Sequence, residues 1–340
     1  MISWEIKKLI KSKSMLISLG ILIFILLISI FVKPVLETED YYIDEKKGHI
    51  EYTSNRTDIA NDKFQKKLDI LKQLSNQTYS DKFSKKIKSM SKEKLDNLNV
   101  DEYKNVDFWK VFNYRATNSL INIGMLIVII ITVSNLYTDE VISSVKDIIL
   151  SSKEKEKALK SKIVIAIFIP LVIYFVYLIW IFIMTCIQQG LPINGDLESF
   201  RIVDNIATLK ANSNIANYVI SNIAIDILMF EGWAMIAMLG SFISKSSISS
   251  VGFLILSIAV AKVMSVVHIL PKGLLSIIST VNYYDLIFGF NKIIGNYLGD
   301  IRIFKMNIDI VNLSIGLLVV IFLGIMTLCF SVIKSKYINR

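Results

Sequence analysis

Cysteine and histidine are scarce in this chain of 340 residues, which contains two of each. Cys186 and Cys329 fall within or at the end of long apolar segments, which argues against a disulfide framework and favours small packing side chains. His49 and His268 are far apart in the sequence, and neither a His-Glu-x-x-His run nor a Gly-x-Ser-x-Gly elbow occurs. A membrane enzyme, such as an intramembrane protease or acyltransferase, is therefore the least favoured function.

The sequence also lacks a phosphate-binding loop of the form Gly-x-x-x-x-Gly-Lys-Ser/Thr. Without it the chain cannot cradle nucleotide phosphates in that way, and we expect it to bind no cofactor and no metal of its own. No internal repeat is visible, and there are few of the helix pairs broken by Gly or Pro that secondary carriers use. If ATP drives this protein, the ATPase is a separate polypeptide.

Long hydrophobic segments are what the chain does contain. Hydrophobic residues make up 53% of it, and they are grouped in blocks. Six blocks reach the length of about 20 residues that a helix needs to cross ~30 Å of hydrocarbon. We therefore expect an all-α integral membrane protein with six transmembrane helices. The expected spans are 15–32, 117–137, 163–187, 217–243, 250–270 and 310–333.

Lysine and arginine are distributed unequally between the two sides of these spans. With the N-terminus inside, the inner segments contain more than twice as many as the two short outer loops. Because cytoplasmic loops retain basic residues, both termini are expected in the cytoplasm, in a multi-pass protein of the cell membrane. Topology thus accounts for the net charge of +9, and nucleic acid is not expected as a partner.

Several segments outside the spans are expected to fold. Residues 1–14 predict an interfacial amphipathic helix. Residues 33–116 predict an extracellular helical domain, which serves either as a spacer or as a contact surface for a substrate or partner. Two of its helices are expected to bury apolar residues that recur at helical spacing, namely Phe64, Leu68, Leu71 and Leu74 on the first and Phe83, Ile87, Met90, Leu95 and Leu98 on the second. The remaining segments are an outer loop at 188–216, short helices dipping into the outer leaflet at 271–309, and a cytoplasmic tail at 334–340.

The cytoplasmic segment 138–162, between the second and third spans, is longer than a plain connector requires. Thr138 is placed to cap a helix whose apolar residues, including Val141, Val145 and Ile148, fall on one face. A pair of serines then interrupts this helix, and a lysine-rich stretch restarts it toward the third span. An amphipathic helix held between two spans is suited to receive a push from a soluble partner and pass it to both.

This segment and the hydropathy of the whole chain resemble the type-2 permeases of ABC exporters. That family has six spans, cytoplasmic termini, an interfacial N-terminal helix, and a signature in its first inner loop of an aromatic residue, Glu, Gly-Thr, Leu-Leu, Pro-x-Ser-Arg and a basic entry to the third span. The residues that match this signature are Tyr137, Glu140, Ile149, Leu150, Lys155 and Lys162. Ser144 and Val145 stand where Gly-Thr is usual, and Lys153 stands for the Pro. The subgroup with a large insert after the first span fits residues 33–116 best.

The resemblance implies a half-transporter whose first inner loop docks into a groove of an ATPase. The implied partners are a dimer of ABC ATPase subunits, which bind ATP and Mg²⁺, and a second copy of this permease or a paralogous one. The residues implied in ATPase coupling are Tyr137, Glu140, Val141, Val145, Ile148, Ile149 and Lys155. The expected function is efflux of an amphipathic substrate, with an antimicrobial peptide or drug ranked ahead of a lipid by family habit alone.

Four ionisable residues are expected within or at the ends of the fourth and fifth spans, where a charge costs roughly 2.5–3.5 kcal/mol. They are Asp226, Glu231, Lys262 and His268. The short loop between these spans makes a hairpin in which Glu231 and Lys262 lie at the same depth. Because five residues turn a helix by roughly 140°, we expect Glu231 to pair with Lys262 and Asp226 to face a partner chain or an aqueous cavity. The same charges suggest the alternative function, an ion-coupled secondary carrier that uses Asp226, Glu231 and Lys262.

Overall fold

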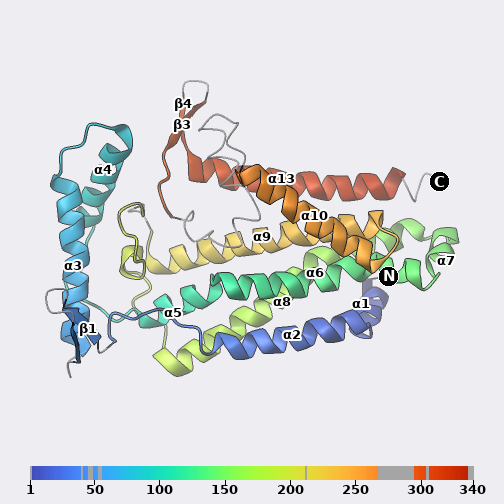
Figure 1. The fold of residues 1–340 in the computed structure, drawn as a ribbon, viewed down its shortest axis with the longest axis horizontal. Coiled ribbons are helices and arrows are strands. Elements are labelled where there is room, and N and C mark those ends of the chain that lie inside the picture. The colour runs from blue at the N-terminus through green and yellow to red at the C-terminus, as the bar shows by residue number, and fades with distance from the viewer. Residues whose placement is uncertain are drawn as a thin grey trace.

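The computed structural model describes residues 2–39, 41–44, 49–52, 56–210, 213–266, 295–303 and 306–335. Most of this part of the chain is helical, in agreement with the all-α expectation. Five long helices run roughly side by side along the molecule (Figure 1). They are α2 (Lys13–Ser29), α6 (Ser119–Ile142), α8 (Lys155–Gln189), α9 (Ile215–Ile243) and α13 (Ile310–Ile333).

Four of these helices, α6, α8, α9 and α13, are long and apolar enough to cross a membrane. Helix α1 (Ile2–Ile10) meets α2 at a bend of 68°, and the pair makes a fifth candidate if it is counted as one span. Helix α10 (Ser247–Val266) covers most of the expected span 250–270, whose end lies outside the described residues. The structure thus agrees with a membrane protein, and the sixth span stays a prediction.

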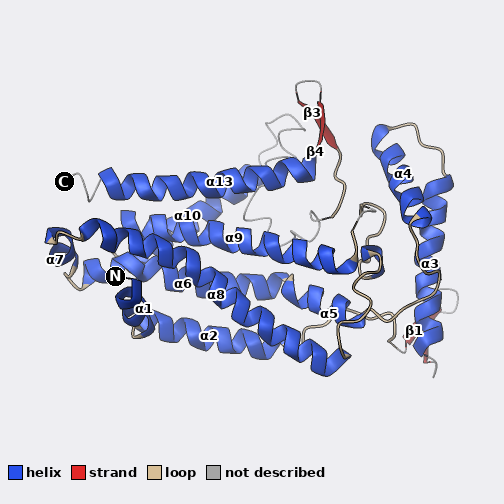
Figure 2. Ribbon diagram, turned by 180° about the vertical axis from the view of Figure 1, so that it is seen from behind, coloured by secondary structure: helices blue, strands red, loops and turns tan. Residues whose placement is uncertain are grey.

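The bend between α1 and α2 is fixed by Ser12, whose backbone is extended (φ −74°, ψ 148°). Its hydroxyl oxygen accepts the backbone N–H of Met15 at 3.1 Å and so caps α2, while the hydroxyl donates to the carbonyl of Leu9 at 2.7 Å. Helix α1 therefore turns away from α2 and lies at the same end of the bundle as the short helix α7 (Lys146–Ser151; Figure 2).

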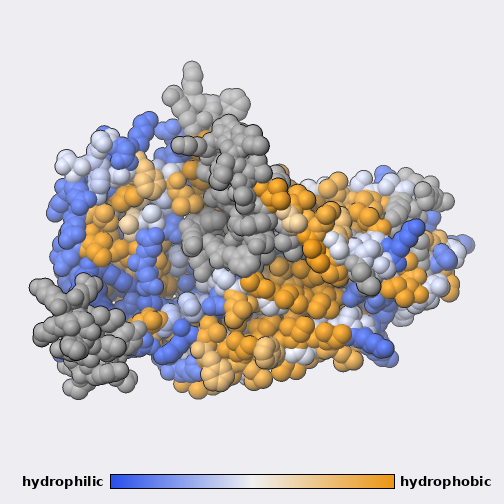
Figure 3. All heavy atoms as spheres, in the orientation of Figure 1, coloured by the Kyte–Doolittle hydropathy of each residue, from blue (hydrophilic) through white to orange (hydrophobic). Residues whose placement is uncertain are grey.

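Helices α9 and α6 form the centre of the bundle. In their most apolar stretches 67% and 56% of the residues are buried, compared with 11% in α13. Exposed apolar side chains cover much of the bundle in Figure 3, and polar residues gather at the end that carries α3 (Arg56–Asn76) and α4 (Lys82–Asp96). A helix surface of this kind suits surrounding hydrocarbon, which offers its neighbours no polar groups.

A helical unit stands at the end of the molecule opposite α7. The helix pair expected within 33–116 is present as α3 and α4. Of the residues expected to be buried, Phe64, Leu68, Leu71 and Met90 are buried, and Leu74, Ile87, Leu95 and Leu98 are half-buried. Phe83 is 40% exposed, which corrects the prediction at that position. Asp81 caps α4 by accepting a backbone N–H at 2.8 Å. Helix α5 (Asp107–Ala116) then leads the chain back to the bundle.

Two small antiparallel hairpins were not expected from the sequence. Strand β1 (Tyr41–Asp44) pairs with β2 (His49–Tyr52), and β3 (Asp300–Ile303) pairs with β4 (Met306–Asp309). The second hairpin corrects the expectation of short helices for the described end of 271–309. Its sequences "DIRI" and "MNID" alternate apolar and polar residues, which is the period of a strand. The earlier part of that segment, up to residue 294, lies outside the described residues.

The loop between α8 and α9 holds α3 and α4 in place. Arg201, in the short 3-10 helix η1 (Ser199–Arg201), lies 4.3 Å from the ring centroid of Phe64. Its guanidinium also donates to the carbonyl oxygens of Val100 at 2.6 Å and Glu102 at 3.0 Å. One side chain from this loop thus ties together segments from both ends of the α3–α4 unit.

Three lysines form further links around the α3–α4 unit. Lys94 of α4 donates to the carbonyl of Ile206 at 2.6 Å, and burial lowers its pKa to about 8. Lys67 and Lys110 each donate to Glu37 at 3.0 Å. Burial alone would raise the pKa of Glu37, but the two ammonium groups outweigh it and lower the pKa below the usual value.

Arg115 joins the α3–α4 unit to the bundle. It lies at the end of α5, is 1% exposed, and donates to the carbonyl oxygens of Ile30 at 2.9 Å and Val32 at 3.0 Å, which follow α2. It also donates to Thr185 at 2.8 Å and to Gln188, both on α8. The ends of α2, α5 and α8 are therefore fixed to one another by a single side chain.

Candidate functional site

The segment between α6 and α8 differs from the helix start expected at Thr138. Helix α6 continues to Ile142, and Thr138 lies buried inside it with its hydroxyl donating to a carbonyl one turn earlier at 3.1 Å. Ser144 then adopts a left-handed conformation (φ 60°), after which the chain forms α7 and enters α8. The helix persists past the expected cap because Glu140 is buried and held from two other helices, so that packing outweighs the local capping preference.

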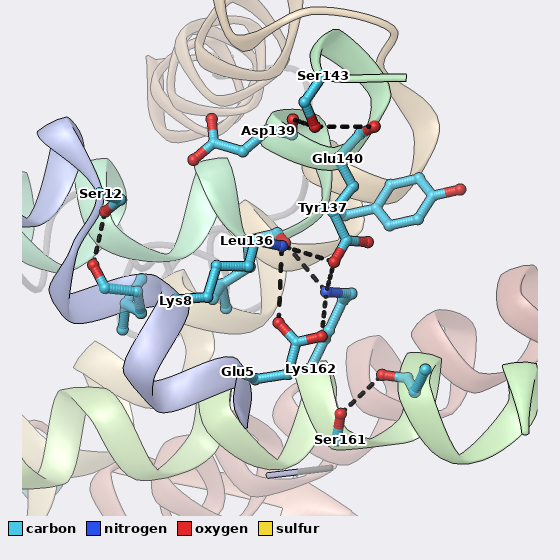
Figure 4. A network of polar contacts seen from close by, with 12 residues as sticks. Glu5, Lys8, Ser12, Leu136, Tyr137, Asp139, Glu140, Ser143, Ser161 and Lys162 are labelled. Carbon is cyan, nitrogen blue, oxygen red and sulfur yellow. Dashed lines mark hydrogen bonds and ion pairs between the residues drawn. The ribbon is translucent and has the colours of Figure 1, made fainter. Parts of the chain in front are cut away.

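Next to this turn, four charged side chains form a buried network that joins three helices (Figure 4). Lys162 of α8 donates to Glu5 of α1 at 2.8 Å and to Glu140 of α6 at 2.6 Å. Lys8 of α1 donates to the same oxygen of Glu140 at 2.5 Å. The side chain of Lys162 is 0% exposed and those of Glu5 and Glu140 are 3% and 1% exposed, whereas Lys8 is 30% exposed.

The ammonium group of Lys162 has a full set of acceptors. Besides the two carboxylates, it donates to the backbone carbonyl of Leu136 at 3.3 Å, so its three N–H donors meet three oxygens. Two lysines balance two glutamates, which offsets part of the cost of removing these charges from water. Oε2 of Glu140 has no hydrogen-bond partner among the described residues. The network fixes α1 to α6 and α8 just before the chain turns into α7.

Helix α1 can supply two members of the network because Glu5 and Lys8 are one helical turn apart and share a face. Sequence reasoning identified Lys162 only as the basic entry to the third span, and it missed Glu5 and Lys8 as partners. The sequence did contain a signal for Glu5: it is the only acidic residue before Glu37, in a segment whose other charged residues are all lysines. What periodicity within one helix could not show is the pairing between helices far apart in the sequence.

The residues expected in ATPase coupling divide into buried, half-buried and exposed members. Tyr137 and Glu140 are each 1% exposed, so they present no side chain to a docking protein, and their part in ATPase coupling stays a prediction. The ring of Tyr137 packs against Phe242 of α9, with 5.1 Å between the centroids. The half-buried members are Val141, Val145, Ile149 and Lys155.

The exposed apolar part of the turn consists of Ile148 together with Ile142. Ile148 is 70% exposed and Ile142 is 60% exposed. Neither is needed to fill the interior, and a large apolar side chain left at such a turn is available to a partner or to a lipid surface. Asp147, Lys157 and Lys160 are exposed nearby in the sequence.

Asp226 lies in the interior of the chain, which corrects the expectation that it faces a partner chain or an aqueous cavity. Its side chain is fully buried in α9 and accepts hydrogen bonds from Asn122 of α6 at 3.1 Å and from the Tyr174 hydroxyl of α8 at 3.0 Å. The expectation considered only charged partners. The available signal was an Asn and a Tyr inside apolar helices, where such groups commonly bond between helices.

Glu231 is also buried in α9, with 6% exposed, and neither carboxyl oxygen has a hydrogen-bond partner among the described residues. Its expected partner, Lys262, belongs to α10, but the Lys262 side chain is outside the described part of the structure, as is the whole of His268. The pairing of Glu231 with Lys262 therefore stays a prediction.

Within the described residues, no group of three His, Cys, Asp or Glu side chains could hold a metal ion. The site thus consists of buried ion pairs beside an exposed apolar turn. Comparison with known protein families, with curated proteins and with solved structures finds no match to this chain.

Proposed function

We propose that this chain is the permease subunit of an ABC exporter, which couples ATP hydrolysis by a separate ATPase to efflux of an amphipathic substrate. The observation that carries the proposal is the turn around α7. There the exposed Ile148 lies close in sequence to a buried ion network that joins α1, α6 and α8. Because the network ties these helices together, force applied to the turn reaches all three at once.

The roles follow from burial. Ile142 and Ile148 supply the docking face for the ATPase, and Glu140 passes the movement to Glu5 and Lys162. ATP and Mg²⁺ bind to the ATPase dimer and not to this chain. A second permease, identical or paralogous, completes the pathway, and the exposed apolar surface of α13 is available for that contact.

The proposal includes six spans, with α1 and α7 on the cytoplasmic side of the cell membrane and the α3–α4 unit outside. The lysine-rich α1 and the lysine-rich start of α8 support this orientation, because cytoplasmic segments retain basic residues. The substrate is an antimicrobial peptide, a drug or a lipid, a ranking that rests on the family resemblance.

Cysteine crosslinking tests the proposal directly. In a background with Cys186 and Cys329 replaced by Ala, Ile148→Cys is compared with Ile187→Cys, which is 73% exposed but lies at the other end of α8. Co-expressed with a candidate ABC ATPase from the same genome, the Ile148→Cys chain is expected to crosslink to that ATPase, and the Ile187→Cys chain is not. The proposal is refuted if neither position crosslinks while vesicles that contain only this chain still transport solute.

Glu231 favours a second candidate, the ion-coupled carrier, because a buried carboxyl group without a partner among the described residues is a candidate proton or cation site. Asp226 and Lys262 are the other residues of this candidate. A carrier moves its solute in response to an imposed ion gradient without ATP, whereas the exporter requires ATP and its ATPase. Transport measured in vesicles with each energy source alone distinguishes the two.

A further inference from the structure

An apolar crevice opens between α1, α2 and α8, at the end of the bundle that carries α7. Its volume is about 320 Å³, at the lower end of the ~300–1,000 Å³ typical of ligand pockets. Its main lining residues are Ile6 and Ile10 of α1, Met15 of α2, and Ile165, Phe168 and Val172 of α8. The crevice is thus built where the amphipathic helix α1 lies against the start of a long membrane helix.

The lining of the crevice is almost entirely apolar, so it favours a hydrocarbon ligand. The polar residue in its lining is Thr132, and its hydroxyl is already 3.0 Å from the hydroxyl of Ser18 and 2.8 Å from the carbonyl of Val128. A polar group placed inside would therefore lose its hydrogen bonds to water without replacement. The part of any ligand that enters must be apolar.

The crevice is open to the surroundings of the bundle. Ile6 is 43% exposed, Phe168 is 60% exposed and Val172 is 58% exposed. In the proposed orientation this side of α8 lies in the cytoplasmic leaflet, so that the neighbours of the opening are lipid chains rather than water.

Three lysines are close in sequence to residues that line the crevice. Lys7, Lys11 and Lys13 are exposed, and none of them forms an ion pair with a described residue. Lys11 and Lys13 stand in the sequence between Ile10 and Met15, which both line the crevice. A crevice that takes a hydrocarbon chain, next to lysines that attract an anionic headgroup, is complementary to an anionic lipid.

We propose that the crevice binds an anionic phospholipid of the cytoplasmic leaflet, with one acyl chain between α1 and α8 and its phosphate near Lys11 and Lys13. The proposal rests on the orientation given under the proposed function. The apolar crevice alone would accept the acyl chain of any lipid. The lysines are what favour a lipid with a negative headgroup. A lipid bound there holds α1 against α8 and so supports the contact between Glu5 and Lys162.

The test uses the purified full chain, without an ATPase, in vesicles that contain a phospholipid with a photoactivatable group in its acyl chain. Phosphatidylglycerol and phosphatidylcholine probes are compared at equal mole fraction, and the labelled peptides are identified by mass spectrometry. We expect the phosphatidylglycerol probe to label peptides 2–15 and 164–173 several-fold more than the phosphatidylcholine probe, since each lysine near an anionic headgroup is worth about fivefold in binding.

Matched variants separate a binding site from general attraction to charge. K7Q/K11Q/K13Q is expected to bring the labelling ratio of the two probes close to one. K153Q/K157Q/K160Q removes the same number of positive charges from the nearby segment 153–160 and is expected to keep the ratio. Val172→Trp fills the crevice from an exposed position and is expected to abolish labelling of 164–173 by both probes. Ile10→Trp, from α1, repeats this test if Val172→Trp fails to fold.

Equal labelling by the two probes overturns the proposal, as does an unchanged ratio in K7Q/K11Q/K13Q. Labelling that survives in both folded Trp variants places the lipid elsewhere and overturns it as well. No ATPase or transported substrate takes part, so a negative result leaves the exporter proposal standing, and a failure of the Ile148→Cys crosslink leaves this measurement unaffected.

Discussion

Lys162→Met is expected to be the most damaging single change in the network of α1, α6 and α8. The substitution keeps the apolar length of the side chain but removes the fully buried one of the two cations that contact both Glu5 and Glu140. Two buried carboxylates are then left with Lys8 alone, which is 30% exposed. Removing one partner of a buried ion pair costs about 3–5 kcal/mol, and we expect a loss of that size in the free energy of unfolding.

The same geometry predicts an order among the variants. Glu140→Gln is expected to cost more than Glu5→Gln, because Glu140 accepts from both Lys162 and Lys8 at 2.6 and 2.5 Å. Lys8→Met is expected to cost least, since its ammonium group is partly in water. The free energy of unfolding is measured by titrating the protein from mild detergent into SDS.

Lys160→Met is the matched control, because Lys160 lies on the same helix and pairs with Glu156 at 2.5 Å, with both side chains about half exposed. Its expected cost is about 0.3–0.5 kcal/mol. The combination of Lys162→Met with Glu140→Gln is expected to cost less than the sum of the two single changes, because the second removes a charge that the first has left unpaired. A Lys162→Met loss as small as that of the control, or strict additivity, would refute the network as a structural link.

Two further predictions concern other buried groups. Because the pKa of Lys94 is lowered from 10.5 to about 8 in the folded chain, the unfolded chain binds more protons between these pH values, and stability is expected to rise with pH across that window by up to about 3 kcal/mol. Subtracting the pH profile of Lys94→Met isolates this contribution, and identical profiles would contradict it. Asp226→Ala is expected to cost about 1–3 kcal/mol for each of the orphaned groups of Asn122 and Tyr174. Asp226→Asn is expected to cost less, because its amide oxygen can still accept from Asn122 and its amide nitrogen can donate to the Tyr174 hydroxyl oxygen. Equal losses in the same SDS titration would show that these hydrogen bonds do not set the stability of the α6–α8–α9 contact.

Apolar blocks and local periodicity predicted the helices of this fold well. The expected span 310–333 coincides with α13, and 217–243 differs from α9 by two residues at one end. The pair α3 and α4 was predictable because its buried residues repeat at helical spacing. In each case the signal lies within one continuous segment.

The contacts that build the site were not predictable in this way. Glu140 was expected to take part in ATPase coupling from its place in a short motif, and its burial among Glu5, Lys8 and Lys162 from other helices was not foreseen. Asp226 was assigned to an aqueous or partner contact because its partners were assumed to be charged, and the structure provides Asn122 and Tyr174 instead. Which residue of one helix meets which residue of another is decided by packing over the whole bundle, and no window of a single sequence contains that information.

The way Arg201 and Lys94 are bonded has a consequence for biosynthesis. The α3–α4 unit is synthesised before α6 and α8. Its hydrogen bonds to the α8–α9 loop, however, join residues far apart in the sequence: Arg201 and Val100 are 101 residues apart, and Lys94 and Ile206 are 112 residues apart. During synthesis, Phe64 and Lys94 therefore lack their final partners, Arg201 and the carbonyl of Ile206, until α6 and α8 have been made and inserted. Maturation of this unit is thus coupled to insertion of the bundle, and a nascent chain cut off before residue 201 would expose an unfinished surface for the quality-control machinery to recognise.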